Sequence, residues 1–131
     1  MIRVEIMNIL ARHLKQIEGL TYHRWLAGEI DSDQLPVIDV RDKRNTLDDD
    51  SGHTLYVEIE LSTKSGARSE TIDETLILMQ QISDAVCNAV KEMCFYGRLR
   101  RNEVAAEKSE YKFVNSLMLF EIDYTADEWS V

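Results

Sequence analysis

Residues 54–64 read TLYVEIELSTK, and residues 113–125 read FVNSLMLFEIDYT. In both stretches apolar residues alternate with polar ones, which is the two-residue period of a β-strand that buries one face. Between them, residues 72–93 carry apolar side chains at the three- and four-residue spacing of an amphipathic helix. Together these segments predict a sheet whose apolar face is covered by helices.

Further elements are expected on the N-terminal side of the first strand. Residues 2–18 have helical apolar spacing and are followed by Gly19, a natural helix stop. Residues 20–26 favour a short strand, and residues 37–40 form another directly after the single proline, Pro36. The fold class is therefore α+β, with a mixed, mainly antiparallel β-sheet and two helices packed on one face.

The boundaries of the long helix are also predicted. Thr71 is a candidate N-cap, because Glu74 stands three residues later in the capping-box pattern, and Gly97 is expected to end the element. The polar residues 41–53 are expected to form a mobile loop or hairpin tip, and residues 98–112 a polar connection. The core is expected to join both strands to both helices through Leu10, Leu14, Leu55, Val57, Ile59, Leu61, Met79, Ile82, Val86, Met118, Phe120 and Ile122.

Length and charge restrict the functional class. A chain of 131 residues is expected to form one domain over residues 1–131. The net charge of −9 repels phosphates and anionic lipids, which disfavours specific nucleic-acid binding and membrane association. Charged residues interrupt the first 14 positions, so no signal peptide is expected and the protein should stay in a cytoplasm. Cys87 and Cys94 are too far apart on one helix for a disulfide and are expected to be packing residues.

Four carboxylates form the most suggestive chemical constellation. If the two long strands pair, Glu58, Glu60, Glu121 and Asp123 all lie on the outward face of one sheet. Paired carboxylates can perform general acid–base catalysis when their environments differ. The same arrangement also suits a solvated face, a subunit interface or the wall of an acidic channel, and the solvated face is the favoured reading.

No other pattern predicts an active site or a metal site. Asp48, Asp49 and Asp50 are consecutive, whereas a calcium loop needs ligands at alternating positions. The chain's histidines are scattered, and no phosphate-binding or nucleophile motif occurs. We therefore expect a protein that is not an enzyme, with no catalytic, metal or cofactor-binding residues and no cofactor.

The basic cluster of Arg98, Arg100 and Arg101 is a candidate oligomer interface. It is too short, and has too few aromatic residues between its arginines, for a nucleic-acid footprint. Its partners on a neighbouring copy would be acidic loops, at residues 29–33 and at Asp48, Asp49 and Asp50. Contact between two different patches can close a ring.

The order of the elements resembles the tail terminator proteins of long-tailed phages, the minor tail protein U family. The resemblance covers essentially the whole chain. It rests on LPVIDV at residues 35–40, HTLYVEIEL at 53–61, RLRR at 98–101 and LMLFEIDY at 117–124, with the acidic residues before the first long strand.

The resemblance implies a structural protein that forms a ring, hexameric in that family, on the end of the tail tube. Such a ring stops polymerisation of the tube and provides the surface for head joining. Its partners are copies of itself, the tail-tube protein and a head–tail connector protein. The protein would reside in the host cytoplasm during assembly and then in the virion tail. Two alternatives stay open: another head–tail connector or neck component, and a small metal-dependent nuclease that uses the four carboxylates.

Overall fold

The computed structural model describes residues 1–48, 51–64, 69–104 and 113–131. In chain order its elements are α1 (Ile2–Leu14), β1 (Thr21–Arg24), the 3-10 turn η1 (Ser32–Gln34), β2 (Val37–Leu47), β3 (Gly52–Lys64), α2 (Ser69–Glu92), β4 (Tyr96–Val104) and β5 (Phe113–Thr125). The five strands form one sheet in the order β1-β2-β3-β5-β4. Only the β1–β2 pair is parallel.

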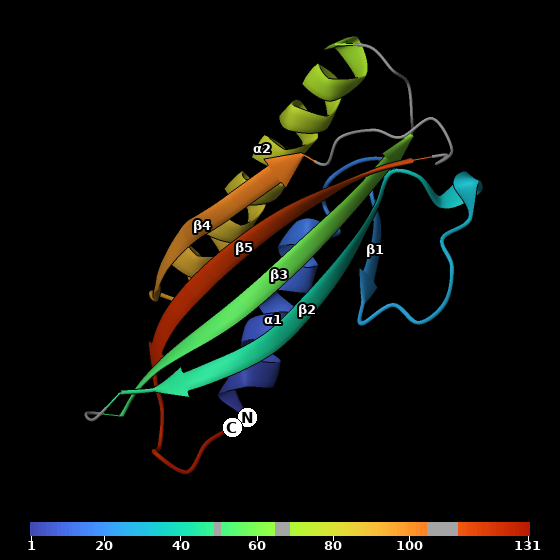
Figure 1. Ribbon diagram of the computed structural model, residues 1–131. Coiled ribbons are helices and arrows are strands. Elements are labelled where there is room, and N and C mark those ends of the chain that lie inside the picture. Colours follow the sequence, from blue (N-terminus) through green and yellow to red (C-terminus); the bar gives the residue numbers. More distant parts are fainter. Residues whose placement is uncertain (49–50, 65–68, 105–112) are drawn as a thin grey trace.

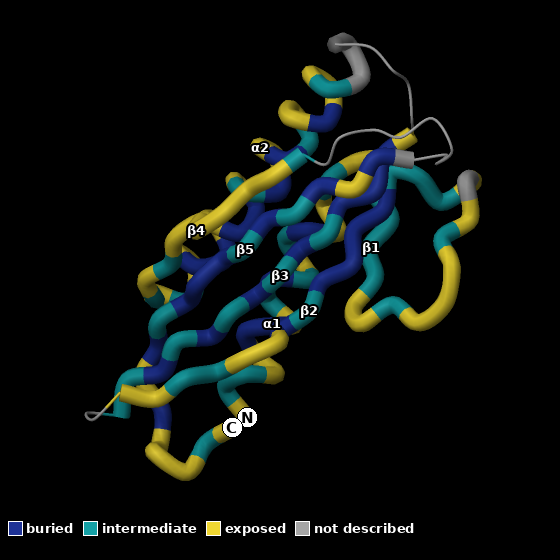
Figure 2. The backbone as a smooth tube through the Cα atoms, viewed as in Figure 1, coloured by how far each residue is buried: buried dark blue, intermediate teal, exposed yellow. Residues whose placement is uncertain are grey.

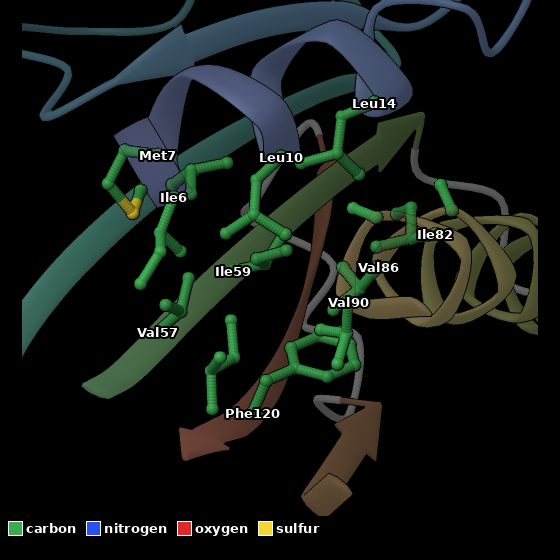
Figure 3. Packing of buried hydrophobic residues seen from close by; sticks show 14 of the residues in the cluster. Ile6, Met7, Leu10, Leu14, Val57, Ile59, Ile82, Val86, Val90 and Phe120 are labelled. Atoms are coloured by element: carbon green, nitrogen blue, oxygen red, sulfur yellow. The ribbon is translucent and has the colours of Figure 1, made fainter. Parts of the chain in front are cut away.

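Both helices lie on one face of this sheet (Figure 1). Their apolar side chains meet those of the central strands, as Figure 3 shows for Leu10 and Ile59 and for Val86 and Phe120. The predicted α+β class, with a mainly antiparallel sheet and two helices on one face, is therefore confirmed. Each of the core residues predicted from the sequence is buried.

The helix ends differ from the predicted ones. The α1 helix ends at Leu14 rather than at residue 18, although Gly19 does adopt a positive φ of 78°. The α2 helix begins at Ser69, so Thr71 lies within it and is not its N-cap. The capping-box pattern therefore placed the start of this helix two or three residues too late.

Helix α2 ends before Gly97, which belongs to β4. Cys94 adopts a positive φ of 56°, its N–H donates to the Lys91 carbonyl (3.1 Å), and the Phe95 N–H donates to the Val90 carbonyl (3.2 Å). These two hydrogen bonds close the helix as a Schellman motif. Gly97 instead allows β4 to pack closely against α2, because a Cβ at this position would lie only 3.1 Å from a Val90 methyl carbon.

Two polar stretches that were expected to be irregular form strands. Residues 41–47 continue β2 and pair with β3, and residues 96–104 form β4 beside β5. The predicted loop or hairpin tip at residues 41–53 is therefore too long, because β2 continues to Leu47 and β3 begins at Gly52. The physical reason is that pairing with a strongly apolar neighbour satisfies the backbone, while most of the polar side chains point to the uncovered face.

The two cysteines are exposed rather than buried. Cys87 lies on the solvent-facing side of α2, and Cys94 occupies the turn that follows it. The expectation that they are packing residues is therefore wrong, because Cys87 faces solvent within α2 and Cys94 lies in the turn beyond the end of the helix.

Candidate functional site: the open face of the sheet

The face of the sheet opposite the two helices carries the residues that the sequence singled out (Figure 1). We call it the open face. Its polar and charged side chains alternate along each strand with the buried core residues. The charged members are Asp39, Arg41, Lys43 and Arg44 on β2, Glu58, Glu60 and Lys64 on β3, Glu121 and Asp123 on β5, and Arg98, Arg100, Arg101 and Glu103 on β4.

A bulge in β2 brings two consecutive basic side chains to the open face. Asp42 is paired with Val57 and Arg44 with Tyr56, so Lys43 is the extra residue. Lys43 Nζ lies 3.0 Å from Glu58 Oε2, and the Arg44 guanidinium lies 4.3 Å from the centre of the Tyr56 ring. An unbroken strand would direct neighbouring residues to opposite faces.

A second bulge has the same effect in β4. Leu99 is paired with Phe120 and Arg101 with Leu119, so Arg100 is the extra residue. Arg98 is paired with Glu121. The three arginines of the predicted cluster therefore all lie on the open face, an arrangement that simple alternation does not give.

The four carboxylates share the open face, as strand pairing predicts, but no two of them lie directly opposite each other. Glu58 and Glu60 lie opposite Leu119 and Leu117, whereas Glu121 lies opposite Tyr56. Asp123 lies opposite Thr54, whose hydroxyl donates a hydrogen bond of 2.8 Å to its Oδ1 atom. The structure thus spreads the four carboxylates over four successive cross-strand pairs, one carboxylate to each pair, rather than gathering them at one point.

Ion pairs within the subunit join the arginines to the carboxylates. Arg98 Nε donates to Glu121 Oε2 at 2.7 Å, and Arg100 Nε lies 3.4 Å from Glu121 Oε1. The hydrogen bond to Glu121 raises the pKa of Arg98. Arg101 bonds Glu103 at 2.7 Å. The basic cluster is therefore a charge-matched surface rather than a bare positive patch.

One acidic partner of the predicted interface lies near the arginines of the same subunit. Asp48 ends the β2 side of the hairpin, where its N–H donates to the Gly52 carbonyl at 2.8 Å. Asp48, Arg98 and Asp123 line one open hollow at that end of the sheet. Asp49 and Asp50, the other two predicted interface acids, lie outside the described residues.

A buried acid beneath the sheet was missed by the sequence reasoning. Asp42 is 5% exposed and accepts bonds from Arg3 Nε (2.9 Å), Arg24 Nη2 (3.1 Å) and Trp25 Nε1 (3.0 Å). Burial opposes its ionisation, but these hydrogen bonds together outweigh burial and lower the pKa of Asp42. The alternation that points Ile38 and Val40 toward the core would, if extended by two residues, have predicted that Asp42 also points inward.

The sequence reasoning also missed a chain of hydrogen bonds at the end of the core beside the β2–β3 hairpin. The Tyr124 hydroxyl donates to Asn45 Oδ1 at 2.7 Å, and Asn45 Nδ2 lies 2.8 Å from His53 Nδ1. His53 Nε2 lies 3.1 Å from the Asp127 carbonyl. If Asn45 donates, His53 carries its proton on Nε2 and the C-terminal segment is held to the hairpin.

The histidines and acids of the described residues do not gather around one point. His13 lies beside Glu92, His23 is in β1, and His53 is buried in the core. Within residues 1–48, 51–64, 69–104 and 113–131, no group of three or more potential metal ligands occurs. No helix in the described part of the chain is long and apolar enough to cross a membrane.

No protein-family model matches the chain, and no curated protein is significantly similar to it.

Proposed function

We propose that the protein is a structural assembly subunit, and specifically a tail terminator that forms a ring on the end of a long-tailed phage tail tube. The observation that carries this proposal is the open sheet face, which ends at β4, an edge strand of the described sheet. The order of elements along the chain, on which the family resemblance rests, also supports a tail terminator. The proposed ring joins copies of the chain through the side of the molecule that carries β4.

The edge of β4 supports an assembly role. β4 is exposed over most of its length (Figure 2), and the described strands pair with only one of its sides. An unpaired edge presents backbone N–H and C=O groups to another chain. Charged side chains and bulges protect such edges from unselective pairing. β4 has both protections, because it carries Arg98, Arg100 and Arg101 and contains a bulge. These features favour a specific partner over unselective strand pairing.

The pairing of the carboxylates supports assembly over hydrolysis. Glu58 forms an ion pair with Lys43, and Glu121 forms ion pairs with Arg98 and Arg100. Metal-dependent hydrolysis of phosphodiesters needs carboxylates that converge on one or two cations. Because the register spreads these carboxylates over four successive cross-strand pairs, and basic side chains pair with Glu58 and Glu121, we propose a structural role rather than a nuclease.

Tube length provides the direct test of the proposal. A tail-tube protein of a long-tailed phage is polymerised with and without the purified protein, and tube lengths are measured by electron microscopy. We expect shorter tubes, with a ring of extra density at one end. Unchanged length and bare ends would overturn the proposal. Cleavage of plasmid DNA with Mg²⁺ or Mn²⁺, lost in Glu58→Gln and retained in a Glu18→Gln control, would favour the nuclease.

A further inference from the structure

An apolar groove runs between α2 and β4 on the helix side of the sheet. Its main hollow has a volume of about 360 Å³. A second hollow continues along the helix and shares Ser83 and Leu99 with the first. Lys91 and Arg98 stand at the rim. The apolar lining of the main hollow includes Val86, Val90, Phe95, Leu99, Phe120 and Ile122.

The C-terminal segment has the complementary composition. Trp129 is 88% exposed and Val131 65% exposed. Asp127 and Glu128 precede them, and both are exposed. Tryptophan is enriched among the residues that anchor protein interfaces, so an exposed Trp129 is a candidate anchor.

This segment is held away from the groove of its own subunit. The Ala126 N–H donates to the Ser51 carbonyl at 3.2 Å, and His53 bonds the Asp127 carbonyl. From there the chain turns toward the start of α1, where both termini lie (Figure 1). The Trp129 N–H donates to Asp127 Oδ1 at 2.9 Å, and Trp129 is not among the residues that line the groove of its own subunit.

We propose that Trp129 of one copy inserts into the groove between α2 and β4 of a second copy. This interface rests on the proposed ring and names the two surfaces that form it. The groove volume falls at the lower end of the range for small-ligand pockets, which suits one large side chain. Lys91 forms no ion pair with any described residue, and it would stand near Asp127 and Glu128 of the incoming segment.

The arginines of β4 explain why the occupant is not a second β4 strand. Pairing of two β4 strands about a two-fold axis would bring Arg98, Arg100 and Arg101 of both copies onto one face, where like charges repel. At the groove, on the helix side of the sheet, an acidic segment instead meets Lys91. Because the segment and the groove lie on different parts of each subunit, the contact is head-to-tail, and such contacts generate rings or filaments.

Two single variants and their mixture test this contact in the full-length chain. Trp129→Ala removes the inserting side chain, and Leu99→Glu places an acid in the groove. Sedimentation measures association, and circular dichroism verifies folding. We expect each variant alone to associate roughly 30-fold more weakly or worse, the loss typical of an aromatic anchor. Mixed together, one intact segment and one intact groove should give dimers and nothing larger.

The control is Val4→Glu, an equivalent change at an exposed position on α1, which should associate like the unmodified chain. Association of Trp129→Ala or Leu99→Glu at the unmodified strength would overturn the contact. A mixture that stays monomeric would do the same, as would an unmodified chain that remains monomeric at about 1 mM, the range of weak complexes. The tube-length assay is scored separately. If Trp129→Ala associates normally and still shortens tubes, the contact is wrong and the terminator function stands.

Discussion

Arg98 and Glu121 are direct neighbours across β4 and β5, with Arg98 Nε 2.7 Å from Glu121 Oε2. Glu121 is 9% exposed, and its other carboxylate oxygen lies 3.4 Å from Arg100 Nε. Removing Arg98 would leave a nearly buried carboxylate with one weaker partner. Arg100 and Arg101 are therefore the better positions at which to change the charge of this surface.

The charge of the β4 bulge is expected to control assembly. Arg100→Glu with Arg101→Glu should abolish ring formation and leave the monomer folded, because Arg98 still neutralises Glu121. Lys43→Glu with Arg44→Glu is the matched control, since it makes the same charge change at the bulge of β2. Sedimentation and thermal unfolding report the two properties. A β4 double variant that still forms rings, or a control that also loses them, would contradict this interface.

Phe120 is expected to contribute strongly to stability. Its side chain is 3% exposed and lies in the core between β5 and α2 (Figure 3). Phe120→Ala should lower the free energy of unfolding by about 3–5 kcal/mol, measured by urea denaturation. Leu119→Ala changes the next residue, which is half-buried on the open face, and should cost about 1 kcal/mol. Equal losses for the two variants would show that the core does not lie on the Phe120 side.

Asp42 should behave as a buried ionic hub. Asp42→Ala leaves Arg3, Arg24 and Trp25 without their shared acceptor, and breaking a buried pair in this way typically costs about 3–5 kcal/mol. Glu92→Gln is the comparison, because Glu92 joins Arg12 across α1 and α2 at an exposed site. Exposed ion pairs contribute little, so Glu92→Gln should leave the urea midpoint nearly unchanged. The prediction fails if both variants have the same midpoint.

Acid should remove the contribution of Asp42. Its pKa in the folded protein is lowered, so the stability it provides is present above the ordinary aspartate value of about 3.9 and lost as the pH falls through the folded pKa. The difference in stability between the unmodified protein and Asp42→Asn should therefore be constant near neutral pH and shrink below about pH 4. Urea denaturation at a series of pH values measures it. A difference that stays constant down to pH 2 would contradict the assignment.

The sequence was sufficient for the parts of the fold that depend on periodicity. Alternation in residues 113–125 gave the bounds of β5, and helical spacing identified α1 and α2. The same alternation placed Glu58, Glu60, Glu121 and Asp123 on one face, because the side-chain period of a strand is fixed by its backbone.

Periodicity could not identify the strands whose side chains are mostly polar. Residues 41–47 and 96–104 have no continuous apolar face, and they are strands because β3 and β5 offer them backbone partners. Strand propensity depends on such neighbours far more than on the residues themselves. The hub of Asp42 with Arg3 and Trp25 has the same origin, since it joins segments up to 39 positions apart.

The sequence by itself thus determined the α+β class, the buried face of each central strand and the presence of a basic cluster at Arg98, Arg100 and Arg101. Only the tertiary structure decided how that cluster is used. The bulge at Arg100 turns all three arginines to one face, and the β4–β5 register sets Arg98 against Glu121. A bulge depends on how two strands pair across the sheet, and that pairing is a property of both strands rather than of the segment that carries the arginines.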